Sequence, residues 1–392
     1  MKGSMTFCAV VFCLCLFGMA ILFWVLPKKD FSEVEKRALQ PLPKPDAASL
    51  LSGDYRARLD AFYADQFPLR ERLVSLKARA EILQGKEENN GILLGRGGRL
   101  GRRRFDMLTP QGTQAGVDFA SPEQVAAACD GILRAKAGLR VPFAVLLPGR
   151  NVDVCPDAFS YPADFSDALT ENIRSHLAGK VAFADTVPLF RSGGDALYYR
   201  TDHHWTTAGA YLGYRAAMEA LGRGDAVIPV EGFRRETVSE RFRGTLWAAG
   251  GMHWVAPDRV EIWYRGNEAD FAVTADGKAL DGFYSLSRLS GIDHYALFLD
   301  GTHDVVTVRN TTGDARPTLL ILRDSFASSM APFLAQHYDL VLLNLSSTRR
   351  DFTDLSALAD TYQADAVLLV YSVENLITAN KLPRLRCGGE TG

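Results

Sequence analysis

The segment TLLILRDSFASS, residues 318–329, contains the pattern that decides the predicted fold. Its first half is an almost continuous apolar run of strand length, which is typical of a strand buried on both faces of a sheet. Ser325 then stands at the carboxyl end of that strand, and small residues that can begin a helix follow it. Parallel α/β sheets place ligands and nucleophiles at this edge. The segment therefore predicts an α/β sheet with a candidate nucleophile at its carboxyl end.

Apolar runs elsewhere in the chain alternate with helical patterns and extend this prediction. Strands are predicted at residues 141–147, 181–184, 340–345 and 366–371, and helices at 121–136 and 206–221. Continuous apolar strands that alternate with helices predict a mostly parallel sheet with helices on both faces. Residues 226–314 contain short aromatic and β-branched pieces between Gly and Asp turns, so we predict a β-rich insertion there.

Residues 5–26 form a stretch of 22 residues without a charged side chain. As a helix it would extend about 33 Å at about 1.5 Å per residue, which is enough to cross the hydrocarbon core of a bilayer. The alternative is a cleaved signal peptide, whose apolar region is only about 7–15 residues long and ends at a small-x-small site. Residues 18–20 resemble such a site, but the apolar run continues beyond it to Leu26. We therefore predict an uncleaved transmembrane anchor.

The composition excludes several classes of protein. With 44 Lys and Arg against 46 Asp and Glu, the net charge of −2 offers no basic surface for a phosphate backbone, so we expect no nucleic acid partner. The 47% hydrophobic and 10% aromatic content argues against a disordered, collagen-like or coiled-coil chain. Outside the anchor, Cys129, Cys155 and Cys387 allow at most one disulfide and form no paired C-x-x-C metal site.

A dense polar cluster, YYRTDHHWT at residues 198–206, precedes the second predicted helix. On an extended stretch Asp202 and His204 would point to one side and His203 to the other. Such a pair supplies a base and a carboxylate that orients it, although capping or ion pairing is the commoner role of an isolated pair. Together with Ser325, the pair provides the three parts of an acyl-transfer triad, which is recognised by roles rather than chain order.

The string Asp202-His203-His204-Trp205 is the string that names the DHHW family, and the chain resembles that family within the SGNH hydrolase-like acyltransferases, which include the alginate O-acetylation proteins. Further short matches occur in the same order at 65–70 (DQFPLR), 90–95 (NGILLG), 243–246 (RGTL), 324–326 (DSF) and 332–334 (PFL). The resemblance implies an SGNH-like three-layer α/β/α fold. Because the serine follows the Asp and His, it also implies a circularly permuted motif order.

The resemblance implies roles for individual residues. Ser325 would be the nucleophile, His204 the general base and Asp202 the carboxylate that orients it. The candidate substrate-binding residues are Arg150, Asn151, Arg323 and Tyr199. The two arginines stand where relatives tend to have lysine; the positive charge is kept, but the geometry of the guanidinium differs. The backbone N–H of Ser325 is the expected oxyanion donor, with a side chain of the Arg150-Asn151 turn as a second candidate. No metal or soluble cofactor is implied.

Three other interpretations remain open at this point. The Asp202-His203-His204 string could bind Mn or Zn, but the upstream D-x-D pair of DHH phosphoesterases is absent from the sequence before it. A non-catalytic scaffold could bind polysaccharide through aromatic side chains such as Trp247 and Trp263, with Trp254 and Tyr264. An esterase would use the same triad and pass the acyl group to water. The sequence does not separate an esterase from a transferase.

We predict a membrane-anchored O-acyltransferase, in particular an O-acetyltransferase, that acts on hydroxyls of a cell-surface or secreted polysaccharide through an acyl-enzyme. By resemblance, acetyl groups would arrive through a multi-pass membrane O-acyltransferase. Lys2, Lys28 and Lys29 around the anchor leave its orientation open. Because the family modifies polysaccharides outside the cytoplasmic membrane, we expect a single-pass protein with its catalytic domain outside the cytoplasm.

The predicted organisation follows from these assignments. Helical spacing broken at Pro68 predicts two amphipathic helices between residues 50 and 83, and residues 89–98 predict a hairpin. The predicted parts are a cytoplasmic N-terminus 1–4, the anchor 5–26, a proline-rich linker 27–49, a helical and hairpin region 50–120, a catalytic domain 121–385 containing the insertion 226–314, and a tail 386–392.

Overall fold

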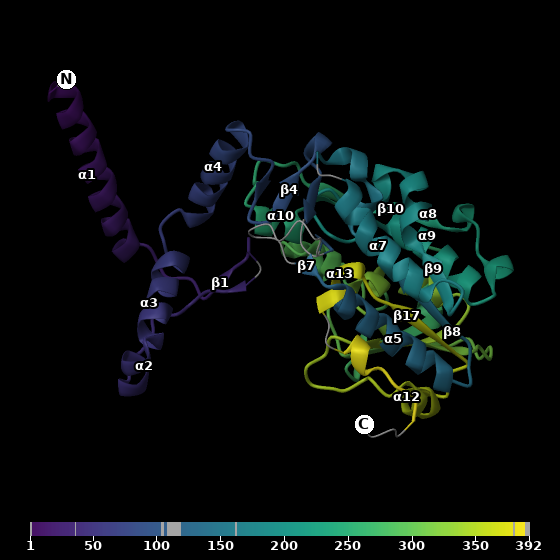
Figure 1. The fold of residues 1–392 in the computed structure, drawn as a ribbon. Helices are drawn as coiled ribbons and strands as arrows, with labels where there is room; N and C mark the ends of the chain where they lie inside the picture. The colour runs from purple at the N-terminus through teal and green to yellow at the C-terminus, as the bar shows by residue number, and fades with distance from the viewer. Residues whose placement is uncertain are drawn as a thin grey trace. The chain divides into compact units, whose positions relative to one another are not determined.

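The computed structural model describes residues 2–35, 37–102, 106–107, 119–160, 163–378 and 381–388. The chain divides into two compact units (Figure 1). The first comprises Met1–Lys86 with Gly251–Trp254, and the second comprises Glu87–Gly250 with Val255–Gly392. The second unit contains the residues predicted to carry the chemistry.

A central sheet organises the second unit. In the described residues it has eight strands in the order β13-β12-β14-β16-β15-β17-β8-β9. Their bounds are β8 Phe143–Leu147, β9 Ala182–Asp185, β12 Phe271–Ala275, β13 Lys278–Leu280, β14 Val305–Asn310, β15 Thr318–Arg323, β16 Asp339–Asn344 and β17 Ala366–Val370. The strands from β16 to β9 run parallel, and β14, β12 and β13 continue the sheet with antiparallel pairing. The predicted mostly parallel sheet is confirmed.

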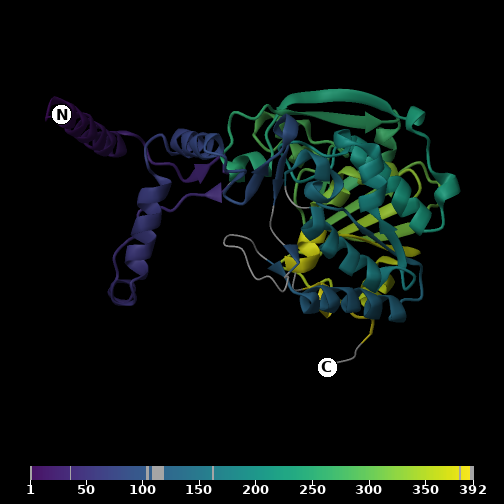
Figure 2. The same ribbon diagram turned by 45° about the horizontal axis from the view of Figure 1, so that its top comes forward.

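Helices cover both faces of this sheet, as Figures 1 and 2 show. Four of these helices are α5 (Pro122–Gly138), α7 (Ala163–Leu177), α9 (Thr207–Ala220) and α12 (Leu355–Tyr362). On β15, Leu319 and Ile321 lie in one core with residues of α9, whereas Leu320 and Leu322 lie in a second core with residues of α5, α7 and α12. This alternation follows from the two-residue period of a strand, and the helices complete the predicted three layers.

Helix starts follow the local signals in the sequence. Ser121 and Gln124 form the predicted capping box of α5, and the Thr206 side chain accepts a hydrogen bond from the backbone of Gly209 at the start of α9. The remaining helices of this unit are shorter, with bounds α6 Asn151–Val154, α8 Thr186–Gly193, α10 Thr245–Gly250, α11 Ala331–Leu334 and α13 Val373–Thr378.

Part of the region predicted as a β-rich insertion belongs to the central sheet, and another part forms a separate pair of strands. Within residues 226–314, β10 (Arg234–Phe242) and β11 (Asp258–Tyr264) pair only with each other among the described strands. In contrast, β12, β13 and β14 form the antiparallel edge of the main sheet. Alternate side chains of β12, such as Phe271 and Val273, are buried in the same core as α9, which holds this edge in the sheet.

The predicted hairpin near residue 90 is present. Strands β3 (Glu88–Asn89) and β4 (Ile92–Leu94) are joined through Asn90 and Gly91, whose φ angles of 52° and 72° lie in the left-handed region. An Asn-Gly pair of this kind is the preferred two-residue hairpin turn. Strand β5 (Leu100–Arg102) pairs with β4, and β6 (Asp106–Met107) pairs with β7 (Phe119–Ala120).

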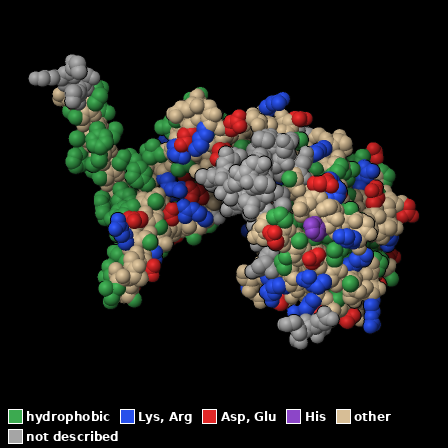
Figure 3. Space-filling model, viewed as in Figure 1, with side chains coloured by type: hydrophobic (Ala, Val, Ile, Leu, Met, Phe, Trp, Pro, Cys, Tyr) green, Lys and Arg blue, Asp and Glu red, His purple; other side chains and the backbone are tan. Residues whose placement is uncertain are grey.

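The first unit begins with the long apolar helix α1 (Lys2–Val25). Its residues Thr6–Val25 are long and apolar enough to cross a membrane, a test that a signal sequence near the N-terminus also passes. Apolar side chains such as Phe7, Leu14 and Trp24 cover its surface (Figure 3). A water-exposed helix of a soluble protein would normally be polar on its outer face, so the composition favours an apolar environment.

A short hairpin and three helices follow α1 in this unit. Strands β1 (Phe31–Ser32) and β2 (Arg37–Ala38) pair, and the helices are α2 Ala47–Ser52, α3 Asp54–Asp65 and α4 Arg70–Leu83. The DQFPLR segment lies between α3 and α4 and ties the hairpin to them. Asp65 accepts hydrogen bonds from Arg37, and the Gln66 amide exchanges two hydrogen bonds with the backbone of Lys29. The segment thus has a structural role in this unit.

Candidate active site

Ser325 lies at the carboxyl end of β15, an interior strand of the parallel part of the sheet. The strands on either side of β15 are β16 and β17, and both follow it in the chain. The chain therefore passes from β15 to β16 on one side, and the connection after β16 returns past β15 to β17 on the other side. Open α/β sheets bind ligands at such a switch point, beyond the carboxyl ends of the strands. The predicted position of Ser325 is confirmed.

Asp324 fixes the turn that presents the serine. Its Oδ1 accepts a hydrogen bond from the backbone N–H of Phe326 at 3.0 Å, at the start of the short 3-10 helix Ser325–Ser329. Its Oδ2 accepts from the backbone N–H of Ser372 at 2.7 Å and from the Asn375 amide at 2.8 Å. A single buried carboxylate therefore joins the loops after β15 and β17.

The structure brings Asp202, His204 and Ser325 together. The Nε2 atom of His204 lies 2.6 Å from the Ser325 Oγ, and its Nδ1 lies 2.6 Å from the Asp202 Oδ1. Asp202 and His204 are buried, while Ser325 is half-buried. The order carboxylate, imidazole, hydroxyl is that of a nucleophile activated by an oriented general base.

Each oxygen of the Asp202 carboxylate is held by further donors. Oδ1 also accepts a hydrogen bond from the backbone N–H of His204, and Oδ2 accepts from the backbone N–H and hydroxyl of Thr245 at 2.7 and 3.0 Å. A Cβ atom on Gly244 would overlap the Asp202 side chain, so glycine lets the backbone before α10 approach the carboxylate. These contacts fix the carboxylate in the orientation that His204 requires.

Aromatic rings hold the imidazole in its plane. The Tyr295 ring stacks on His204 with a centroid distance of 3.8 Å and an angle of 7°, and the Phe326 ring lies 4.8 Å away. Burial raises the pKa of Tyr295 far above its usual value, so its hydroxyl stays protonated and donates to the Ser325 carbonyl at 3.2 Å. The base and the nucleophile are thus positioned by the same tyrosine.

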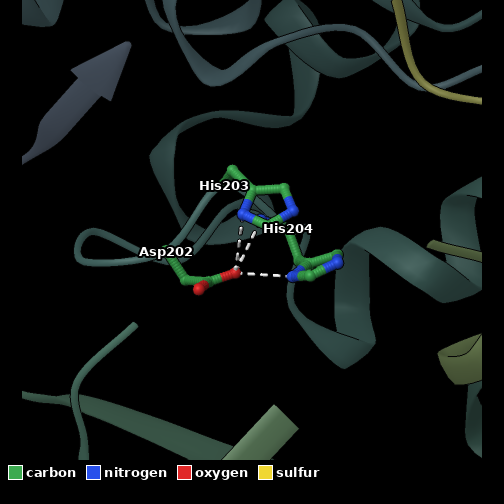
Figure 4. Close-up of side chains that lie close together, drawn as sticks. All are labelled: Asp202, His203 and His204. Atoms are coloured by element: carbon green, nitrogen blue, oxygen red, sulfur yellow. Dashed lines mark hydrogen bonds and ion pairs between the residues drawn. The ribbon is translucent and has the colours of Figure 1, made fainter. Parts of the chain in front are cut away.

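His203 does not point away from the pair as the extended-strand argument predicted. Its Nδ1 lies 2.6 Å from the Thr245 Oγ and 3.6 Å from the Asp202 Oδ1, and Figure 4 shows both histidine rings on the side of this carboxylate. The reason is local geometry: residues 201–204 form a series of bends, so the alternation of a strand does not apply.

Asp202 and the two adjacent histidines are a potential metal-ligating group. One donor atom each from Asp202, His203 and His204 lies within 4.8 Å of the others. Both ring nitrogens of His204, however, already lie at hydrogen-bonding distance from oxygen atoms of Asp202 and Ser325. A metal ion on His204 would have to displace one of these contacts, so the donor set fits the triad better than a metal centre.

A cavity of about 420 Å³ opens at Ser325 and His204. Residues between 288 and 303 form much of its wall, including the polar side chains of Arg288, Asp300 and His303. The guanidinium of Arg288 binds the Asp300 carboxylate through two contacts of 2.7 and 2.9 Å. A space of this size, with hydrogen-bonding groups around a nucleophile, suits a small polar ligand.

The four predicted substrate-binding residues lie outside the residues that line this cavity, and all four are buried. Arg150 forms an ion pair of 2.7 Å with Asp153, and the Asn151 amide donates to the backbone carbonyl of Leu100. Tyr199 is packed among aromatic rings.

Arg323 donates hydrogen bonds at 3.3 Å to the Ser328 hydroxyl and to the His303 carbonyl. Burial lowers its pKa to about 10, which leaves the guanidinium charged at neutral pH. It lies behind the cavity wall and supports it. A role of these four residues in substrate binding stays a prediction.

Sequence reasoning missed three residues that build the site: Gly244, Thr245 and Tyr295. The first two belong to the RGTL match, which marked the segment without indicating a role. Tyr295 had no local signal, because it reaches His204 from a short 3-10 helix (His294–Leu297) far along the chain.

The described thiols are all free, so the single disulfide that the cysteine count allowed is not formed. Trp247 and Trp263 are buried, which removes them as exposed platforms for a sugar.

Comparison with known proteins identifies the kind of domain. Residues 153–271 match the family described as the SGNH hydrolase-like domain of the acetyltransferase AlgX. No curated protein sequence matches the chain.

Two solved structures with this fold cover most of the chain. A DHHW family protein from Eubacterium siraeum is 18% identical with a TM-score of 0.56, over 77% of this chain and 98% of its own. PatB1 of Bacillus cereus with a sulfonyl adduct is 19% identical with a TM-score of 0.58, over 75% of this chain and 97% of its own. The predicted resemblance and the SGNH-like fold are confirmed.

Proposed function

We propose that the chain is a membrane-anchored O-acetyltransferase that acetylates hydroxyls of a polysaccharide outside the cytoplasm through an acetyl-Ser325 intermediate. The observation that carries this proposal is the continuous chain of contacts from Asp202 through His204 to Ser325, with both links at 2.6 Å. The match to the AlgX acetyltransferase domain supports acetyl transfer as the reaction class.

In the first half of the reaction, the Ser325 Oγ attacks the carbonyl carbon of the acetyl donor while His204 Nε2 takes the hydroxyl proton. Asp202 stabilises the imidazolium that forms. The negative charge on the carbonyl oxygen is met by the backbone N–H of Ser325, at the end of β15. The bond from the carbonyl carbon to the donor then breaks, and the departing group takes the proton from His204.

In the second half, a sugar hydroxyl enters the cavity and attacks the acetyl carbon. His204 takes the proton of that hydroxyl, the bond from carbon to Ser325 Oγ breaks, and the serine recovers the proton. The cycle needs no external oxidant, metal or soluble cofactor in its balance. Because one imidazole serves both halves, its position between Tyr295 and Phe326 matters to each of them.

The membrane location is part of the same proposal. The apolar helix α1 supports an anchor by its length and composition. Such an anchor would keep the catalytic unit near a multi-pass membrane acyltransferase that supplies acetyl groups. Alkylation of an introduced cysteine in the catalytic unit by an impermeant reagent on intact cells tests the orientation; protection until lysis would place the unit in the cytoplasm and contradict the proposal.

An esterase with the same triad is the second candidate, because water can replace the sugar hydroxyl in the second half. In the deciding experiment, the full chain in detergent is incubated with p-nitrophenyl acetate and a panel of oligosaccharides. Both released acetate and acetylated sugar are measured. Acetylated sugar that disappears in S325A supports the transferase. Acetate alone across the panel would support the esterase, and stoichiometric metal in the active protein would support a metal centre.

A further inference from the structure

A second histidine beside the triad has no role in the reaction described above. His203 lies with its ring centroid 3.8 Å from that of His204, and its side chain is 28% exposed. Its Nδ1 lies 2.6 Å from the Thr245 Oγ and 3.6 Å from the Asp202 Oδ1. Thr245 in turn contacts Asp202. His203 is therefore connected to the triad through a hydroxyl.

The direction of the hydrogen bonds in this connection follows from the number of protons available. Asp202 as a carboxylate only accepts, so the single hydroxyl proton of Thr245 goes to its Oδ2 at 3.0 Å. The Thr245 oxygen must then accept a proton from His203, which requires the neutral histidine to carry its proton on Nδ1. The complete chain runs from His203 through Thr245, Asp202 and His204 to Ser325.

We propose that His203 is a positioning residue for acyl transfer, acting through Thr245 on the Asp202 carboxylate; this inference rests on the proposed function. The His203 N–H polarises the Thr245 hydroxyl, which strengthens the hydrogen bond that this hydroxyl donates to Oδ2. Oδ2 is thereby held away from His204, and Oδ1 stays directed at the imidazole. The benefit is largest when His204 carries the proton of Ser325, because that charge depends on the alignment of Asp202.

The alternative is that His203 merely fills space. The centroid of its ring lies 3.8 Å from that of His204 and 5.9 Å from that of Phe326, so packing alone would explain its presence. The neighbours of His203 include Asp202 from its own loop, Thr245 from α10 and Phe326 from the helix after β15. Variants that keep the ring and remove the N–H separate the two roles.

The test measures kcat and KM for acetyl release from p-nitrophenyl acetate by the full chain in detergent. H203F keeps an aromatic ring and removes the N–H, while T245V removes the hydroxyl and keeps the shape. Each should lower kcat about tenfold with KM little changed, the size expected when one hydrogen bond of the chain is lost. The double variant should fall no further than T245V, because both changes break one chain.

Rescue provides the second arm. H203N retains an amide N–H near the Nδ1 position and should recover much of the rate lost in H203F, whereas H203Q, whose amide lies further out, should not. His176→Phe, a histidine on α7 outside the cavity lining, is the matched control and should keep the wild-type rate.

Three results would overturn the inference: full kcat in H203F, a double variant about a hundredfold slower as expected for independent effects, or H203N as slow as H203F. Loss of folding in H203F leaves the comparison of H203N with H203Q to decide. An S325A variant with wild-type turnover would instead contradict the proposed function itself, so the two failures are distinguishable.

Discussion

The loops after β15 and β8 lie at the same edge of the sheet but differ in what they present there. The loop after β15 is open, because its serine faces a cavity, and the loop after β8 is closed, because its arginine pairs with an aspartate of the same loop. Val370 of β17 pairs with Arg323 of β15 on one side and with Leu146 of β8 on the other, so the two strands end at similar levels. After β15 the chain presents a half-buried serine to a cavity.

After β8 it folds back on itself. Arg150 is buried against Asp153, with three contacts of 2.7 to 2.9 Å. The difference teaches that a place at the carboxyl edge is not sufficient for a role in chemistry. A charged side chain is less available to a substrate when it is already paired within the protein, and the Arg150 guanidinium is paired with Asp153 of its own loop.

The largest expected effect lies at the open loop. S325A and H204A should each lower turnover of p-nitrophenyl acetate by about 10³-fold or more, because the members of a triad act as a unit. Stopped-flow or steady-state absorbance measures this, and Ser290→Ala, an exposed serine on a neighbouring 3-10 helix, is the matched control. Activity in S325A comparable to that of the control would remove the distinction between the two loops.

At the closed loop, the expected effect is on stability. R150A leaves the Asp153 carboxylate buried without this partner, which should lower the free energy of unfolding by about 3–5 kcal/mol. Urea unfolding measures the loss, and the double variant R150A/D153A should recover part of it. If R150A has the wild-type free energy of unfolding but fails to acetylate sugars, Arg150 contacts substrate and the loop is not closed.

Gly244→Ala tests how closely the carboxylate of the open site is confined. The added Cβ overlaps the side chain of Asp202, so the variant should lose about 1–3 kcal/mol of stability or displace Asp202 and slow turnover. Gly291→Ala is the control, because a Cβ there would meet only the Arg288 carbonyl, at an ordinary 3.7 Å. Equal behaviour of the two variants in turnover and unfolding would show that the approach of residue 244 is unimportant.

The smallest effect expected is a pH dependence of stability that involves neither loop. Burial lowers the pKa of His337, whose Nε2 contacts the Tyr214 hydroxyl, from 6.5 to about 4. Between these values the unfolded chain binds a proton that the folded chain does not, so stability is full above pH 6.5 and declines as pH falls toward 4.

Because His337 is partly exposed, we expect a loss of only about 1–2 kcal/mol. H337Q should flatten this decline when urea unfolding is followed at both pH values. Such a variant also separates acid loss of stability from acid loss of activity. An unchanged decline in H337Q would assign the effect to other groups.

The sequence predicted the parts of the molecule that depend on local patterns. The capping box at Ser121, the apolar strand before Ser325 and the Asn-Gly turn of the hairpin are each specified by a few adjacent residues. The association of Asp202 and His204 with Ser325 was predicted from their chemical roles, because three complementary groups in one chain are informative together.

The remaining features depend on contacts between distant segments. Tyr295 stacks on His204, which is far from it in the sequence. The antiparallel edge formed by β12 and β14 depends on the pairing of β14 with β16. The orientation of His203 was predicted incorrectly since its loop bends. Arg150 and Asp153 are close in sequence, but their burial as a pair depends on the loop that surrounds them.

The central claim is that Ser325 carries the acetyl group during turnover. Intact-protein mass spectrometry after acid quenching, during reaction of the full chain with p-nitrophenyl acetate, tests it most directly, with peptide mapping of the modified site. We predict a mass increase of one acetyl group on the peptide containing Ser325 in the wild type, and none in S325A. Turnover with no acetylated Ser325, or with the acetyl group on another residue that S325A retains, would contradict the account.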